Sequence, residues 1–496
     1  MSPEPNQVTT SLTYDATSTP IAEQIEATIL ALPNVSIGVN VTDLGSNKYE
    51  VIFGGGENVG DGWAVSGEVI NKTDAAITSS KTVDGVRPGE PIISPDRGWA
   101  RCGVFYQQRL FLGGFKSLGN AYLFSKQGEF YNFDDRFTEA NGPALIPMDL
   151  DSGERIVEIT KNRNLLIFTN DAEYWLAERA VSATDAPNHV QSSRHGISAG
   201  VPVVENEGAA LFVHGNGNVL AEFRYTDVAG TFAAIDISLL AAHMVQDITD
   251  VAQRSASTSS HGNSAVLVKS SGHALLVTLL REQDETAYST IETGSQIIAV
   301  CATHDGVISL LADQDGNKRL LQFNDDCLLD DAVTGEFDIP TETISGLDNL
   351  NGKDVWVIAD DHVFKVATVV NGEVALPIAV TSWCIGTWIA PLVETLPVSP
   401  MVAHQIAVRR KKRIHSVHLS LVDTTSIALS VNGGKIFDLD LRKYGDLADV
   451  PELAAGFTGE ISLRGLVGFQ DGPTVTITQV RPGRLNVRSL TIETTR

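Results

Sequence analysis

The chain has 496 residues, of which 43% are hydrophobic and 20% charged, as in a folded protein with more than one core. Its 61 acidic and 36 basic side chains give a net charge of −25, which disfavours ordinary binding to nucleic acids and anionic membranes. The four cysteines contain no CxxC pair, so zinc and redox motifs are unsupported and buried thiols are expected.

The first 20 residues contain no basic segment followed by an apolar core, and no run of 18 apolar residues occurs in the chain. We therefore expect synthesis and folding in the cytoplasm, without insertion into a membrane.

Residues 1–90 predict a small α+β domain. A helix is expected over Ile21–Leu32, whose apolar residues recur on one face, and a strand over Tyr49–Phe53. The glycine-rich segment from Gly54 lacks the Lys-Ser/Thr pair of a phosphate-binding loop, so a plain loop is expected. The Pro- and Gly-rich segment Val83–Pro95 predicts a linker.

Residues 91–380 repeat one pattern: an apolar strand, a turn rich in Gly, Asp or Asn, and a second, alternating strand. These hairpins begin near Gly103, Asn162, Glu207, Gly262, Asp305 and Lys353. Their spacing of roughly 40 to 55 residues is typical of four-stranded propeller blades. A sandwich would not need so many equivalent hairpins. The sequence therefore predicts a mainly β protein with a β-propeller-like core.

Residues 381–496 break the repeat and predict a separate antiparallel β domain. Its strands could complete the core or contact a neighbouring subunit, and the sequence leaves both open.

Two short motifs resemble catalytic or calcium-binding loops. They are HDG at His304 and DQDGNK at Asp313, and the second lacks the later Glu of a calcium loop. Asp-Gly pairs are also typical of tight hairpins, so we expect turns at both places.

Charge is unevenly distributed. Residues 300–361 contain 14 acidic and 3 basic side chains, with a cluster at Asp325, Asp326, Asp330 and Asp331. This cluster is interpreted as a solvated rim, an acidic lumen or a subunit contact, and a paired-carboxylate hydrolase is a further alternative. The opposite charge is concentrated at Arg409, Arg410, Lys411, Lys412 and Arg413. Salt bridges between subunits are the preferred interpretation, and an exposed loop is the alternative.

The sequence nominates no catalytic residue, metal ligand or cofactor. His415 and His418 are not spaced to place two ligands on one face of a strand, and no GxSxG motif occurs. We therefore expect a protein that is not an enzyme.

A more specific pattern lies in the segment FYQQRLFLGG, residues 105–114, and in AYLFSKQGEFYNFD, residues 121–134. An aromatic-Arg-Leu strand precedes a Ser-x-x-Gly-acidic-aromatic turn and Asn-Phe. This pattern resembles the nozzle, or tail tubular protein B, family of short-tailed bacteriophages. The matching residues are Arg109, Ser125, Gly128, Phe130, Asn132 and Phe133, and further segments match in the same order, including the one that contains Trp175. The resemblance covers roughly residues 100–425.

The resemblance implies a structural protein of the virion tail that forms a homo-oligomeric ring, a hexamer in the family's pattern. The ring would lie below the portal and tail adaptor, end the channel through which DNA leaves, and carry spikes or fibres outside. DNA would pass without specific binding, and an acidic lumen would repel it. Arg109, Asn132 and Trp175 are expected to hold strands and turns together.

Two alternatives come from other classes of protein. A tail-associated glycan-binding or depolymerising propeller would need aromatic platforms and convergent carboxylates, and aromatic residues make up only 7% of the chain. A cellular scaffold of the WD or kelch type would repeat signatures that do not recur here.

Overall fold

The computed structural model describes residues 21–32, 39–46, 48–53, 77–80, 93, 98–134, 139–255, 263–283, 285–314, 316–324, 326–398, 401–402, 405–406, 411–441, 451–453, 455–466 and 468–495. These residues form 35 strands, one α-helix and three short 3-10 helices, so the prediction of a mainly β protein is confirmed. In this part of the chain, no helix is long and apolar enough to cross a membrane.

The chain divides into two compact units, and neither is continuous in sequence. Unit 1 comprises Met1–Ala199, Gly208–Ala210 and Glu222–Ile235, and unit 2 comprises Gly200–Glu207, Leu211–Ala221 and Asp236–Arg496.

The N-terminal elements are α1 (Ile21–Leu30), β1 (Val39–Gly45) and β2 (Lys48–Phe53), the last two an antiparallel pair. The predicted helix therefore exists and ends two residues earlier than expected. Ala22 and Ile29 on its buried face pack against Val39 and Val41, which confirms the α+β character of this segment. The predicted loop from Gly54, and the predicted linker apart from Ile93, lie outside the described residues.

Five antiparallel sheets follow, and in each the strands are ordered as in the sequence. The first contains β3 (Cys102–Tyr106), β4 (Arg109–Gly113), β5 (Ala121–Phe124) and β6 (Ala144–Pro147), and the second β7 (Ile156–Lys161), β8 (Leu165–Thr169), β9 (Glu173–Leu176) and β10 (His189–Ser193). The third contains β11 (Val204–Asn206), β12 (Ala209–Val213), β13 (Leu220–Thr226) and β14 (Thr231–Asp236), and includes residues of both units. The fourth contains β15 (Ile248–Arg254), β16 (Asn263–Lys269), β17 (Ala274–Leu280) and β18 (Glu285–Ile291), and the fifth β19 (Gln296–Ala302), β20 (Ile308–Gln314) and β21 (Asn317–Gln322).

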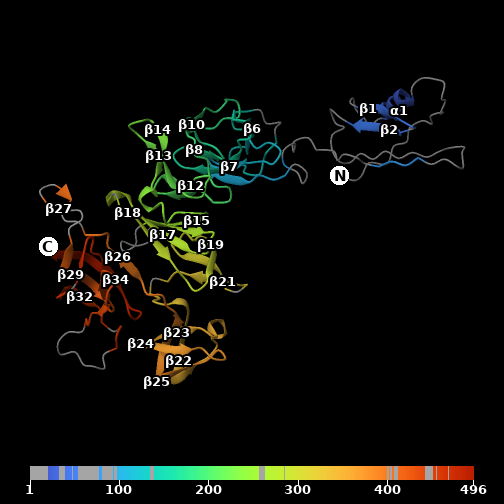
Figure 1. Cartoon of the computed structure of the whole chain (residues 1–496). Helices are drawn as coiled ribbons and strands as arrows, with labels where there is room; N and C mark the ends of the chain where they lie inside the picture. Colours follow the sequence, from blue (N-terminus) through green and yellow to red (C-terminus); the bar gives the residue numbers. More distant parts are fainter. Residues whose placement is uncertain are drawn as a thin grey trace. The chain divides into compact units, whose positions relative to one another are not determined.

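These successive meanders make the core propeller-like, as predicted, and the labels of Figure 1 follow them in chain order. The 3-10 helices are η1 (Leu239–Ala241), η2 (Arg281–Gln283) and η3 (Asp348–Leu350).

Both motifs that resemble functional loops are hairpin turns, as predicted. The N–H of Gly306 donates to the carbonyl of Thr303 at 3.0 Å between β19 and β20. The N–H of Gly316 donates to Asp313 Oδ1 at 2.8 Å between β20 and β21. Both glycines have a positive φ, which a left-handed turn position requires.

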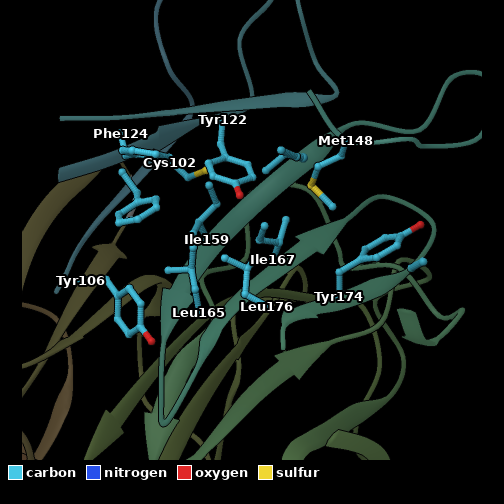
Figure 2. Close-up of a cluster of buried hydrophobic side chains, with 13 residues drawn as sticks. Cys102, Tyr106, Tyr122, Phe124, Met148, Ile159, Leu165, Ile167, Tyr174 and Leu176 are labelled. Atoms are coloured by element: carbon cyan, nitrogen blue, oxygen red, sulfur yellow. The ribbon is translucent and has the colours of Figure 1, made fainter. Parts of the chain in front are cut away.

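The apolar side chains of the first two sheets form one core. Figure 2 shows these side chains between the strands, among them Tyr122, Phe124, Ile159 and Leu165, all with 1% exposure or less. Sheet residues whose side chains alternate between two faces bury one face in this way, which explains the alternating patterns of β3 and β4.

The sixth expected hairpin forms, but in a different kind of sheet. Its strands β23 (Asp354–Ala359) and β24 (His362–Thr368) join two long strands, β22 (Asp330–Ile344) and β25 (Val374–Thr387), in the order β22-β25-β23-β24. Because β25 lies between β22 and β23, this sheet is not a meander. The expectation of about six equivalent units is therefore corrected: the described residues form five meanders, four with four strands and one with three.

The described residues between Leu392 and the end of the chain form ten strands, and the predicted antiparallel β character is confirmed for them. They are β26 (Leu392–Glu394), β27 (Met401–Val402), β28 (Gln405–Ile406), β29 (Lys412–Thr424), β30 (Ala428–Val431), β31 (Phe437–Asp438), β32 (Phe457–Arg464), β33 (Phe469–Gln470), β34 (Val475–Thr478) and β35 (Val487–Thr495). One sheet has the order β26-β34-β30-β31, and β29 pairs with β32, β33 and β35 in another. Their apolar faces share a core that includes Val417, Leu419, Leu429 and Val475.

Candidate functional site

Arg109, at the start of β4, is a buried cation that is 2% exposed. Its Nη1 donates to the carbonyls of Ser125 at 2.8 Å and Gly142 at 2.6 Å, and its Nη2 donates to that of Ala140 at 3.0 Å. The guanidinium carbon lies 4.9 Å from the centroid of the Phe124 ring. Burial lowers the pKa of Arg109, although a guanidinium stays charged at neutral pH. The side chain joins β4 to both ends of the segment that follows β5.

That segment begins with a closed turn. The Leu110 N–H donates to Ser125 Oγ at 2.9 Å, and the Gly128 N–H donates to the Gln108 carbonyl at 2.8 Å. Asn132 Nδ2 donates to Glu129 Oε2 at 2.7 Å, and this bond, followed by that of Lys126, lowers the pKa of Glu129. The motif residues therefore hold one another through backbone and side-chain hydrogen bonds.

The turn carries aromatic side chains to the surface. Phe130 is 37% exposed and Tyr131 88% exposed, whereas Phe133 is half-buried. Phe130 packs edge-on against Phe105, which is 51% exposed, with 5.1 Å between ring centroids. We call Phe105, Phe130 and Tyr131 the exposed aromatic group, and the buried clamp of Arg109 fixes the turn that carries two of them.

Trp175 on β9 is 8% exposed and belongs to a buried aromatic cluster of unit 1. Its ring lies 5.3 Å from that of Phe232 and 6.2 Å from that of Tyr225. Phe168 packs edge-on against Phe223 at 5.5 Å in the same cluster. The indole N–H has no hydrogen-bond partner among the described residues. The packing of its ring therefore places Trp175 to hold strands together.

The acidic cluster does not form a single exposed surface. Asp325 lies outside the described residues, and Asp326 is exposed. Asp330 accepts from the Gly294 N–H at 2.9 Å, and burial raises its pKa. Asp331 is buried, and its carboxylate lies 2.5 Å from Arg319 Nη1 and 3.5 Å from Lys353 Nζ. The expectation of an exposed acidic residue is wrong for Asp331, because two cations neutralise it inside the protein.

The basic run is also divided. Arg409 and Arg410 lie outside the described part of the chain, and Lys411 is exposed. Lys412 is 0% exposed and its Nζ donates to the Val398 carbonyl at 3.4 Å. Arg413 Nε donates to the Leu466 carbonyl at 2.7 Å. Because the side chain of Lys412 is buried within its own chain, the expectation that it forms a salt bridge to another subunit is wrong.

The structure brings together three carboxylates that sequence reasoning missed. Oxygens of Asp151, Glu154 and Asp171 lie within 4.8 Å of one another, as metal ligands would. Arg194 Nη2 lies 2.9 Å from Asp151, and Thr169 Oγ1 donates to Glu154 at 2.5 Å, so the negative charge already has partners. The folding of the β8–β9 hairpin brings Asp171 to the other two, which spacing alone does not reveal.

A second missed group lies on the β29 sheet. His418 Nδ1 is 2.6 Å from Ser462 Oγ, its directly paired residue on β32, and His418 Nε2 is 3.5 Å from Glu493 Oε1. Ser416 also donates to Glu493, and this bond is the main reason that the pKa of Glu493 is lowered. Because Ser462 and Glu493 are exposed on the sheet, water competes for their polar atoms, and we assign this group no catalytic role.

The prediction of four buried thiols is wrong for Cys301, which is exposed because it lies on the solvent side of β19, and Cys327 and Cys384 are only partly buried. Cys102 is buried, and burial raises its pKa to about 12. The sulfurs of Cys327 and Cys384, distant in sequence, lie 3.9 Å apart. The hydrogen bond from Cys384 lowers the pKa of Cys327 and raises that of Cys384. The two cysteines do not form a disulfide. They meet because β25, which contains Cys384, pairs with β22, which begins three residues after Cys327.

Comparisons with known proteins provide no family. No protein-family model matches the chain, and no curated protein matches it. Among solved structures, it is similar to virginiamycin B lyase from Staphylococcus aureus, with 10% identity over 47% of this chain and 71% of the other, and a TM-score of 0.29. It is similar to YCF48 bound to D1 peptide, with 10% identity over 57% and 77% of the two chains, and a TM-score of 0.28. It is also similar to BBS1N in complex with ARL6DN, with 11% identity over 60% and 87%, and a TM-score of 0.28. Such low scores support no inference about fold or activity.

Proposed function

We propose that this chain is a structural subunit of a bacteriophage tail of the nozzle type, and not an enzyme. Identical subunits would form a ring, a hexamer by resemblance, around a channel through which DNA leaves the virion. The tail adaptor would bind one end, and spikes or fibres would bind outside.

The observation that carries the proposal is the Arg109 clamp. The residues that resemble the nozzle pattern, from Arg109 to Phe133, fix a turn and expose Phe130 and Tyr131. A buried cation bonded to backbone carbonyls stabilises the local structure, so this side chain has a structural role. Exposed aromatic residues on a rigid base are typical of protein contacts. We infer that the exposed aromatic group contacts a second copy of this chain.

Electron microscopy of the purified protein, alone and with tail adaptor or virions, tests the assembly. We expect a closed ring with an axial channel, located at the tail tip in virions. A protein that stays monomeric with adaptor and does not bind tails would contradict the proposal.

Replacement of the aromatic contact tests its location. We expect Phe130→Ser with Tyr131→Ser to reduce the oligomer fraction at least tenfold in light scattering. Val228→Ser, at a valine that is 100% exposed elsewhere in unit 1, should leave the oligomer unchanged. Equal oligomer fractions for the two variants would place the contact elsewhere.

Glycan binding is the second candidate, because a sugar ring also stacks on exposed aromatic side chains such as Tyr131. Incubation with host surface polysaccharide distinguishes the two. Binding or shortened polysaccharide chains would favour the glycan-binding or depolymerising protein, and we expect neither.

A further inference from the structure

A pocket of unit 1 is positively charged, whereas the chain as a whole is negatively charged. It has a volume of about 270 Å³ and lies between the segment before β3, the β4–β5 connection and the start of β7. Its walls include Trp99, Arg101, Phe115, Lys116, Arg155 and Ile156. Three of these residues are cations and no acidic residue lines the pocket, although the chain has a net charge of −25.

The three cations are available for a ligand. Arg101, Lys116 and Arg155 are exposed, and none forms an ion pair with a carboxylate in the described part of the chain. Burial raises the pKa of the Glu158 carboxyl, and the charge of Arg101 opposes this effect. Three positive side chains around one cavity repel one another, and an anion between them would relieve that repulsion.

The backbone of the pocket brings these side chains together. A Cβ atom at Gly98 would lie 2.8 Å from Cβ of Lys116, and one at Gly119 would lie 3.0 Å from Cβ of Arg155. At Gly114, where φ is +70°, it would lie 2.9 Å from Cβ of Arg101. Each cation therefore packs its stem against a glycine, and a larger residue at any of the three positions would displace it. The pocket floor is firm, because Phe115 and Ile156 are each 1% exposed.

Trp99 adds a flat surface to the charged pocket. It is 69% exposed, so a ring can approach its indole from solvent. A guanidinium group can donate two parallel hydrogen bonds to two oxygens of one phosphate. Aromatic side chains stack on flat rings or on sugar rings. The volume is just below that of sites for drug-sized molecules, so the ligand should be small.

We propose that this pocket binds a small phosphate ester, with the phosphate between Arg101, Lys116 and Arg155 and the attached ring against Trp99. The site is independent of the proposed assembly into a ring, since all of its residues belong to one unit of one chain. The ester could come from a nucleotide or from a phosphorylated sugar, and the probes below separate these sources.

Calorimetry of the full chain with adenosine 5′-monophosphate, glucose 6-phosphate and inorganic phosphate tests the site. We expect saturable binding of at least one ester, tighter than that of inorganic phosphate. Preference for the first ester identifies a nucleotide site, and preference for the second a sugar-phosphate site. Absence of binding to all three at millimolar concentration would overturn the proposal.

Variants locate the binding in the pocket. Lys116→Gln with Arg155→Gln should weaken binding at least tenfold, whereas Lys161→Gln, at an exposed lysine outside the pocket, should not. Trp99→Leu should weaken ester binding and leave that of inorganic phosphate unchanged. Thermal unfolding of each variant checks that the exposed substitutions preserve the fold. Unchanged affinity in the double variant would overturn the assignment to this pocket.

Discussion

Arg109 makes three hydrogen bonds to backbone carbonyls, and a lysine at this position could not make them all. We expect Arg109→Lys to lower the free energy of unfolding by about 3 kcal/mol, because buried carbonyls would lose charged donors. Urea denaturation measures the change. Arg163→Lys is the control, since Arg163 is half exposed and its ion pair with Asp227 lies at the surface, so a change of about 0.5 kcal/mol or less is expected. Equal losses of unfolding free energy in the two variants would show that the buried hydrogen bonds of Arg109 contribute no more to stability than a surface ion pair.

Glu173 on β9 is 0% exposed, and burial raises its pKa, although the N–H of His195, which donates to Glu173 Oε2 at 3.4 Å, opposes this effect. A folded-state pKa above the unfolded value means that the folded protein binds the proton more tightly. The contribution to stability is therefore present below the unfolded pKa and is lost as the pH rises through the folded pKa.

Glu173→Gln removes this dependence. We expect the free energy of unfolding of the variant at pH 8 to exceed that of the native chain by about 1 kcal/mol, so that the variant unfolds at a higher temperature. This advantage should be lost near pH 4. Glu139→Gln, at an exposed position, should change neither value. An advantage that is largest at acid pH would mean that folding lowers the pKa of Glu173 instead of raising it.

Among single residues, motif spacing could nominate Arg109, Ser125 and Asn132, because a local turn brings them together. It could not reveal Ser462, His418 and Glu493, which meet only through the pairing of strands far apart in sequence. The burial of Lys412 was equally hidden, since a run of cations in sequence normally indicates an exposed surface.

Among the elements, the β3–β4 hairpin has a strained turn. Gln107 and Gln108 both have positive φ, at 47° and 60°, where glycine or asparagine is usual. We expect Gln108→Gly to stabilise the protein by about 0.5 kcal/mol, since relief of a left-handed residue, roughly 1–2 kcal/mol, exceeds the entropy that glycine loses, roughly 0.5–1 kcal/mol.

The β23–β24 turn provides the control. Asp361 also has a positive φ, of 65°, but aspartate tolerates this conformation better than glutamine, so Asp361→Gly should change stability little. Thermal unfolding compares the two variants. A destabilised Gln108→Gly protein would show that the glutamine side chain contributes more than the turn strain removes.

Hairpins were predictable because each is encoded within about twenty residues by alternation and turn chemistry. The order of the β22 sheet was not, because β25 inserts between β22 and β23 from a later part of the sequence. Local periodicity contains no information about which strand becomes the neighbour of another.

Over the chain as a whole, the net charge of −25 should control assembly. If identical subunits form a ring, they repel one another, and salt screens that repulsion. We expect the oligomer fraction to rise when NaCl increases from about 10 mM to about 150 mM, where the screening length falls to about 8 Å. Sedimentation at the two concentrations measures it. A fall in the oligomer fraction would instead indicate contacts dominated by salt bridges.

The composition and the hairpin repeat could predict a β-rich chain with a propeller-like core, and this is confirmed. The interleaved division into units could not be predicted, since it depends on long-range packing of Phe223 and Phe232 against Phe168 and Trp175.

That interleaving has a consequence for biosynthesis. Phe168 and Trp175 must wait for Phe223 and Phe232 to leave the ribosome before their cluster can close. At typical elongation rates of about 5–20 residues per second, the delay is roughly 3–11 s. During that interval the nascent chain exposes large aromatic side chains, so we expect the second sheet to need a chaperone during translation.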